Sequence, residues 1–234
     1  MDKDSIRREV YRRLIDEGVS KPPYPIEGRI PNFAGAEEAA SRLTRLKKFL
    51  EADVIKINPD SPQRPVRYMA LSMGKKVVMP TPRIKKGFIF LDPDKIRDIG
   101  FASTIRGAFR LGKIMEVEDL PRIEYIVEGS VAVSPDGSRL GKGEGYAELE
   151  YAILLEYGKI DYDVEIVTTV HELQIVDYIP RDVYDVSINY IVTPRRIVRC
   201  KSMYRPNGII WDALDKEKIM EIPILKKLWE SRHK

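Results

Sequence analysis

A glycine-rich stretch in the second half of the chain carries the residues best suited to binding chemistry. An apolar run ends at Ser134, Pro135-Asp136-Gly137 can form a turn, and glycines stand at positions 141, 143 and 145 before a helical pattern starts at Tyr146. Glycines let backbone amides approach a ligand closely, and a helix N-terminus favours an anion. Arg139 and Lys142 add positive charge there. The stretch predicts a phosphate site, although a glycine-rich hairpin without a ligand would have the same spacing.

The spacing of these glycines differs from that of two familiar phosphate motifs. A P-loop needs Gly-Lys followed by Ser or Thr, and a dinucleotide fingerprint places its glycines at other intervals. In this chain Gly141-Lys142 is followed by Gly143. The stretch therefore indicates an anion-binding turn of another kind.

The remaining sequence predicts the elements that position this turn. Short apolar runs alternate with helical patterns, which is typical of an α/β protein with a mainly parallel sheet and helices on both faces. The predicted strands cover residues 54–57, 76–79, 123–127, 130–133, 164–170 and 188–192, and the predicted helices between them cover residues 62–73 and 146–156.

Both ends of the chain also have helical patterns. Apolar residues recur every four positions from Ile6 to Leu14, and Asp4 or Ser5 can cap this helix. Further helical patterns cover residues 35–50 and 216–232, the latter with a break near Pro223. We expect a single α/β domain over residues 1–234, in which residues 1–50 form a helical N-terminal cover.

Composition narrows the class of protein. The chain has 234 residues, of which 43% are hydrophobic and 32% charged, and no apolar run is long enough to cross a membrane. The N-terminus is charged rather than apolar and Cys200 is the only cysteine, so we expect a protein of the reducing cytoplasm. One cysteine and two histidines exclude a Cys/His zinc site, so a metal would need mainly oxygen ligands.

The charge distribution favours an anionic ligand. A net charge of +4 is too small by itself to indicate a nucleic-acid partner. Residues 1–100 nevertheless carry 21 basic and 14 acidic side chains. A cationic N-terminal half suits a ligand such as a nucleotide.

The glycine-rich stretch also resembles a known signature. Arg139-Leu140-Gly141-Lys142-Gly143-Glu144-Gly145-Tyr146 resembles the Arg-Leu-Gly-x-Gly-x-Gly-Tyr signature of the 5-formyltetrahydrofolate cyclo-ligase family, also called methenyltetrahydrofolate synthetases. Lys3-Asp4-Ser5-Ile6-Arg7 is similar to the family's N-terminal Lys-x-x-Leu/Ile-Arg, and residues 184–194 resemble its closing strand. Residues 29–33, 80–83 and 222–225 look closer still to the branch called methenyltetrahydrofolate synthetase domain-containing proteins.

The resemblance implies a Rossmann-like three-layer α/β/α sandwich and an ATP-dependent enzyme. In the family, ATP phosphorylates the formyl oxygen of 5-formyltetrahydrofolate, a neighbouring amine nitrogen attacks the activated carbon, and phosphate leaves to give 5,10-methenyltetrahydrofolate. An amide-type oxygen is a poor leaving group until it is phosphorylated. The protein therefore mainly has to position two ligands and neutralise phosphate charge.

The matching positions imply a nucleotide site and a magnesium site. The nucleotide positions are Lys3, Arg7, Arg139, Leu140, Gly141, Lys142, Gly143, Glu144, Gly145 and Tyr146. Asp185 matches a carboxylate that helps to hold Mg²⁺, and Glu148 stands where the family has an Asp. We expect Lys3 and Arg7 beside the glycine-rich turn, and Glu148 and Asp185 facing each other across a cleft where they share the ion.

The chain departs from the family pattern in two places. The family's Tyr-Tyr-Asp is replaced by Tyr146-Ala147-Glu148. The loop after residues 54–57, where folate-binding members commonly have a Glu, begins with Asn58-Pro59-Asp60. We expect Asn58 and Arg83, which follow strands where α/β folds bind ligands, to meet a reduced pterin or folate. Because this loop is altered, a different pterin or another formyl- or amide-bearing substrate also stays open.

Two alternative functions also stay open. A non-catalytic nucleotide- or RNA-associated module of the same fold would keep the nucleotide positions. Because the chain lacks the RNP pattern of basic, glycine and aromatic residues, a nucleic-acid partner is not expected. A kinase-like step in cofactor metabolism would keep the ATP chemistry and change the substrate.

Overall fold

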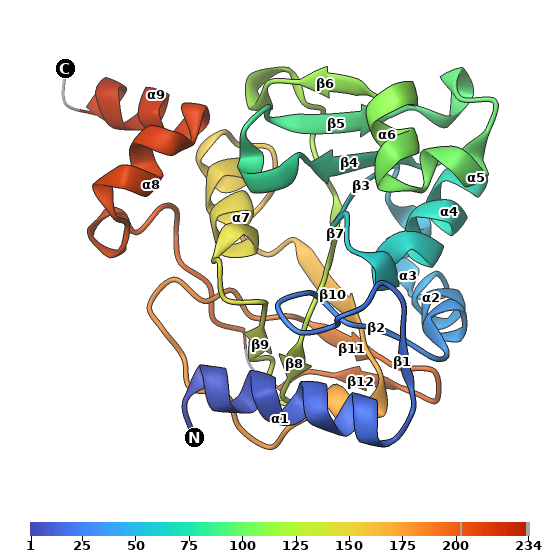
Figure 1. Cartoon of the computed structure of the whole chain (residues 1–234). Coiled ribbons are helices and arrows are strands. Elements are labelled where there is room, and N and C mark those ends of the chain that lie inside the picture. Colours follow the sequence, from blue (N-terminus) through green and yellow to red (C-terminus); the bar gives the residue numbers. More distant parts are fainter. Residues whose placement is uncertain (202, 233–234) are drawn as a thin grey trace.

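Strands from most of the chain form one large, mainly parallel sheet. The computed structural model describes residues 1–201 and 203–232. Within these residues the strand order is β12-β11-β10-β7-β3-β4-β5-β6 (Figure 1). The bounds are β3 (Val54–Ile57), β4 (Lys76–Pro80), β5 (Phe88–Leu91), β6 (Lys113–Met115), β7 (Tyr125–Glu128), β10 (Glu165–Thr169), β11 (Tyr190–Val192) and β12 (Ile197–Arg199). The strands from β11 to β4 are parallel, whereas β12, β5 and β6 are antiparallel additions at the edges.

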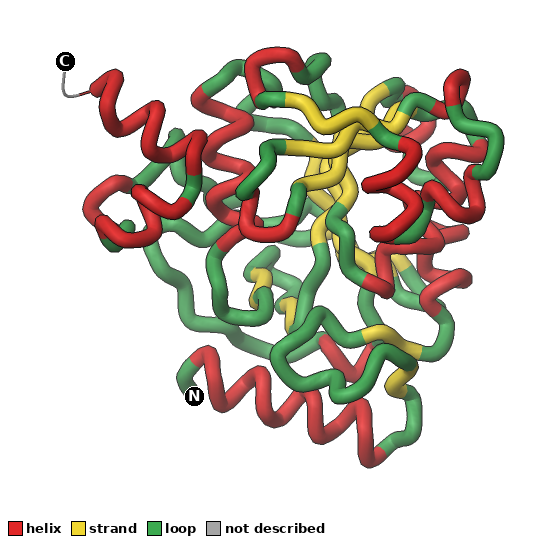
Figure 2. Tube along the Cα trace, turned by 45° about the horizontal axis from the view of Figure 1, so that its top comes forward, coloured by secondary structure: helices red, strands yellow, loops and turns green. Residues whose placement is uncertain are grey.

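Helices cover both faces of this sheet, which confirms the predicted three-layer α/β/α class. Figure 2 shows the strands in the middle with helices on either side. One face packs against α7 (Tyr146–Glu156), α8 (Lys216–Glu221) and α9 (Pro223–Arg232). The other face packs against α2 (Ala36–Leu43), α3 (Lys47–Glu51), α4 (Arg64–Ser72), α5 (Ile99–Ala102) and α6 (Ile105–Leu111). Successive side chains of a strand enter opposite cores, as Ile126 and Val127 do.

The N-terminal helix α1 (Lys3–Asp16) packs on a small hairpin. This hairpin consists of β8 (Ala132–Val133) and β9 (Arg139–Leu140), which are antiparallel. The apolar face of α1 shares a core with Leu140. Because β9 leads directly into the glycine-rich turn, this packing brings α1 to that turn (Figure 1). A second short hairpin, β1 (Ser20–Lys21) with β2 (Asn32–Phe33), follows α1.

The structure corrects the predicted elements near the N-terminus. The predicted helix over residues 35–50 is two helices, α2 and α3, because Leu46 adopts an extended backbone between them. The first helix is capped by Asp2 rather than by Asp4 or Ser5, because the Asp2 carboxylate accepts the Ser5 amide at 2.8 Å.

The sequence predicted the parallel strands better than the antiparallel ones. The predicted strand over 130–133 shortens to β8 and belongs to the hairpin, and β5, β6 and β12 were not predicted. The helix α7 and the break between α8 and α9 at Pro223 are confirmed. Across the described ranges, no helix has the length and apolar character needed to span a membrane.

Candidate functional site

The glycine-rich turn, residues 141–145, connects β9 to α7 in a form that leaves its amides free. Gly143 has φ +107° and Gly145 has φ +69°, a region that favours glycine over residues with a side chain. Within the described ranges, the backbone amides of residues 141–145 donate no hydrogen bond. No side chain caps α7, so the first amides of this helix also lack a capping acceptor. The turn can therefore offer several donors to an anion.

Arg139 is fixed beneath this turn. Its side chain is 2% exposed, Nη1 donates to the Gly129 carbonyl at 2.8 Å, and the guanidinium forms an ion pair with Glu148. The guanidinium also lies against Gly141, because a Cβ on that glycine would stand 3.2 Å from Nη1. A buried, oriented cation therefore underlies the free amides.

Arg7 reaches the turn from the N-terminal helix. Its Nε donates to the Gly141 carbonyl at 2.8 Å, and its guanidinium lies against Gly143. Lys3, one turn earlier on α1, instead holds Asp185 at 2.6 Å and Asp182 at 2.7 Å. The expected position of Arg7 beside the turn is thus confirmed, whereas the contacts of Lys3 are with the two aspartates.

The two carboxylates assigned to magnesium each have a cationic partner of their own. Glu148 pairs with Arg139, and Asp185 pairs with Lys3 and accepts the Asp182 amide. In the part of the chain that the structure describes, no group of three or more His, Cys, Asp or Glu side chains could hold a metal ion. Each of the two carboxylates is therefore already paired with a cation in this structure, and the shared magnesium site stays a prediction.

A cavity of about 220 Å³, termed the first cavity, joins the turn to the carboxyl ends of β3 and β4. This edge of a parallel sheet is where α/β proteins commonly bind ligands. The residues that line it include Asn58, Asp60, Arg83, Lys142, Glu148 and Glu150. The structure therefore brings both predicted substrate positions, Asn58 and Arg83, to the same cavity as the turn.

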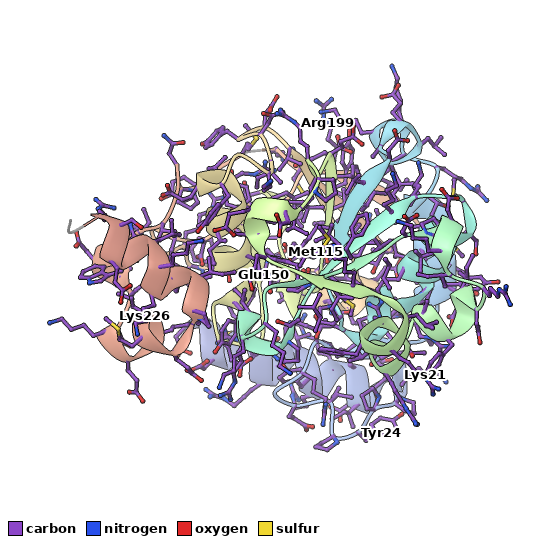
Figure 3. All side chains as sticks on the ribbon, turned by 90° about the horizontal axis from the view of Figure 1, so that it is seen from above. Lys21, Tyr24, Met115, Glu150, Arg199 and Lys226 are labelled. Atoms are coloured by element: carbon purple, nitrogen blue, oxygen red, sulfur yellow. The ribbon has the colours of Figure 1, made fainter. Side chains whose placement is uncertain are left out.

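A buried charge cluster behind this cavity was missed by the sequence reasoning. Lys56, fully buried on β3, has its Nζ 2.7 Å from Glu128 on β7 and 2.5 Å from Glu150 on α7. It also donates to the Asn58 side chain at 2.8 Å. Figure 3 shows Glu150 near the middle of the molecule. The available signal was a lysine inside an apolar strand, because a buried lysine almost always needs a charged partner.

Strand register explains this cluster. Lys56 is opposite Ile126 in the parallel pairing of β3 with β7, so Glu128 lies two residues further along on the same face. Glu150 approaches from α7, which covers that face. Burial raises the pKa of Glu150 to about 7, and the nearby Lys56 opposes this shift. Burial likewise raises the pKa of Asp60 at the cavity wall.

Replacing Glu150 by glutamine should flatten the pH dependence of stability. A folded-state pKa of about 7, above the ordinary 4.5, favours the folded state when Glu150 is protonated. That stabilisation is complete below pH 4.5 and is lost as the pH rises through about 7. Urea unfolding of both proteins across this range measures the difference. Parallel stability profiles would contradict the assignment.

Comparison with known proteins identifies the family that this chain resembles. The model of the 5-formyltetrahydrofolate cyclo-ligase family matches residues 2–194. Relatives named methenyltetrahydrofolate synthase domain-containing protein are 37% identical over 238 residues in Mus musculus and 36% identical over 234 residues in Danio rerio. These matches cover 98% and 97% of this chain but only 64% and 61% of the relatives. The chain thus spans less than two thirds of their length.

The fold is also that of a solved relative. The NMR structure of 5,10-methenyltetrahydrofolate synthetase from Aquifex aeolicus is 19% identical and superposes with a TM-score of 0.54, over 92% of this chain and 100% of that chain. The family match over residues 2–194 confirms the kinship predicted from the glycine-rich signature. The chain belongs to the 5-formyltetrahydrofolate cyclo-ligase family.

Proposed function

We propose that this chain is an ATP-dependent ligase that converts 5-formyltetrahydrofolate, or a related formylated pterin, to the 5,10-methenyl form with release of ADP and phosphate. The observation that carries the proposal is the turn at residues 141–145, whose free amides lie beside Arg7 and Arg139 at the rim of the first cavity. Membership of the cyclo-ligase family supplies the reaction class.

The residues of the turn have the chemistry that phosphoryl transfer to a formyl oxygen requires. Free amides and Arg7 can hold the phosphates, and Arg139 supplies fixed positive charge where negative charge develops. Asn58 and Arg83 line the same cavity and can hold the pterin with its formyl group near these donors. We propose that positioning and charge neutralisation by these side chains account for most of the catalysis.

Magnesium is proposed to accompany the nucleotide phosphates, since it is usually held by one or two carboxylates together with phosphate oxygens. Glu148 and Asp185 remain the candidate ligands. Either carboxylate would have to give up its present partner, Arg139 or Lys3, to bind the ion.

Calorimetry and turnover on the whole chain test this function. ATP should bind, and a panel of formylated pterins should show ATP-dependent formation of a methenyl product together with ADP. Arg7→Ala should weaken ATP binding, whereas Arg8→Ala, on an exposed neighbouring position of α1, should not. Nucleotide binding without turnover on any substrate would favour the non-catalytic module instead. Absence of both would overturn the proposal.

A further inference from the structure

The loop between β4 and β5, residues 81–87, has a strained backbone. Arg83 has φ 56° and Ile84 has φ 55°, and among the residues that the structure describes they are the only ones other than glycine with a positive φ. This left-handed region is unfavourable for residues that carry a Cβ, and most unfavourable for a β-branched residue such as Ile84. Strained residues persist only where their surroundings determine them, and they cluster at active sites and ligand-binding loops.

Contacts on both sides of Arg83 hold the loop in this form. Ile84 is fully buried in the core that contains α7, and its amide donates to the Thr81 carbonyl at 2.8 Å. The Thr81 hydroxyl donates to the Gly87 carbonyl at 2.9 Å and accepts the Lys86 amide at 3.1 Å. Arg83 lies between these anchors, and its side chain lines the first cavity while it remains 55% exposed. Because glycine would adopt this backbone at lower cost, the arginine indicates that a side chain is needed here.

Helix α8 contacts this loop through Glu221. The Glu221 carboxylate pairs with Lys85 at 2.8 Å and lies 3.6 Å from Nη1 of Arg83. The hydrogen bond from Lys85 holds the pKa of Glu221 below its ordinary value, so this carboxylate is charged at neutral pH. Ile219 and Ile222, on either side of Glu221, are buried in the same core as Ile84. The carboxylate therefore stands on a helix that is itself fixed by packing.

The same face of α8 also contacts the glycine-rich turn. Lys218, three positions before Glu221, donates from Nζ to the Glu144 carbonyl at 2.5 Å and lies 4.9 Å from the centre of the Tyr146 ring. Figure 1 shows α8 beside α7, the helix that follows the turn. The turn and the loop at residues 81–87 both line the first cavity. Helix α8 therefore connects two walls of this cavity, although it lies beyond residue 194, where the family match ends.

We propose that Glu221 is a positioning residue, which holds the guanidinium of Arg83 at the mouth of the first cavity so that it can bind an oxygen atom of the formylated substrate. This inference rests on the proposed function, in which Arg83 contacts the substrate. An exposed ion pair of this kind adds little to stability. Its effect should appear in substrate binding, because a guanidinium that is already held in place loses less conformational freedom when the substrate binds.

A set of variants tests this role of Glu221. Glu221→Gln removes the charge and keeps the size of the side chain. Glu230→Gln on α9 is the matched control, since Glu230 is also an exposed carboxylate, 3.9 Å from Lys226. Arg83→Ala removes the group that Glu221 is proposed to position, and Arg83→Ala/Glu221→Gln completes a double-mutant cycle. The kcat and the KM values for ATP and for the formylated pterin are measured for each protein.

Glu221→Gln should raise the KM of the pterin by about fivefold and leave kcat and the KM of ATP within about twofold, because it changes how the substrate is bound. Glu230→Gln should change none of these values. In the protein that already carries Arg83→Ala, the change Glu221→Gln should have no further effect, since the group that it positions is gone. An unchanged KM in Glu221→Gln, or an equal rise with and without Arg83, would overturn the positioning role.

Hydrogen–deuterium exchange tests the contact between α8 and the loop without any turnover. The amides of residues 83–87 should exchange faster in Glu221→Gln than in the unsubstituted chain, and at the same rate in Glu230→Gln. Unchanged exchange in Glu221→Gln would show that Glu221 does not hold the loop, whatever the activity. If the exchange result is as expected but the unsubstituted chain turns over no formylated pterin, the proposed function and the positioning role both fail, and only the structural contact stands.

Discussion

Replacing Lys56 by methionine should lower the free energy of unfolding at neutral pH by about 3 to 5 kcal/mol. The reason is that Lys56 is the cation shared by Glu128 and Glu150, and all three side chains are buried. Without the ammonium group, the two buried carboxyl groups lose their cation, and Glu150, whose pKa is already raised to about 7, would have to bind a proton to stay buried. Urea unfolding followed by circular dichroism measures the loss.

A triple variant supplies the control for Lys56. Replacing Lys56 by methionine together with Glu128 and Glu150 by leucine removes every charge of the cluster, and such exchanges for apolar residues are often neutral or stabilising. The triple variant should therefore recover most of the stability lost by the single variant. A single variant that loses less than about 1 kcal/mol would show that the ion pairs of Lys56 add little to the stability of the folded protein.

The contacts within this buried cluster could not be predicted from the sequence. The strand at residues 54–57 was predicted because three of its four residues are apolar. Lys56 was counted as part of this strand, and no separate role was predicted for it. Its partner Glu128 lies 72 positions later in the chain. Only the register of β3 with β7 and the placement of α7 bring the three side chains together. A pattern among neighbouring residues cannot indicate a contact between positions so far apart in the chain.

Local sequence patterns did predict those parts of the site that are made by residues close together in the chain. The turn at residues 141–145 and helix α7 follow from glycine spacing and an apolar helical run, so both were predicted with their bounds. The position of Arg7 came from family resemblance, because an amphipathic pattern says which face of a helix is buried but not what it packs against. The partners of Glu148 and Asp185 likewise depended on packing.

The antiparallel edges of the sheet were missed for a related physical reason. The parallel strands lie next to helical patterns that the sequence predicted, whereas β5 and β6 flank α5 and α6, two short helices of four and seven residues that were not predicted. Phe88 to Leu91 are all apolar, but a run of four such residues does not by itself distinguish a strand from a buried loop or helix. The site itself lies at the carboxyl ends of the central strands, where the prediction was strongest.

Replacing Arg139 by methionine should weaken the binding of metal-free ATP by about 100-fold or more, because a buried guanidinium is the cation fixed most firmly beneath the turn. The same change should also lower stability, since Glu148 and the Gly129 carbonyl each lose a partner. Calorimetry without magnesium measures the affinity, and urea unfolding measures the stability.

Variants of Glu148 distinguish the loss of ATP affinity from the loss of stability. The double variant Arg139→Met/Glu148→Leu leaves no carboxylate without its cation, so it should regain most of the lost stability while its affinity for metal-free ATP stays low. The single variant Glu148→Leu frees the Arg139 guanidinium from its present partner, so it should bind metal-free ATP at least as tightly as the unsubstituted chain. If the double variant instead recovers affinity together with stability, Arg139 acts only as a structural anchor for α7 and the phosphates are held by the turn and Arg7 alone.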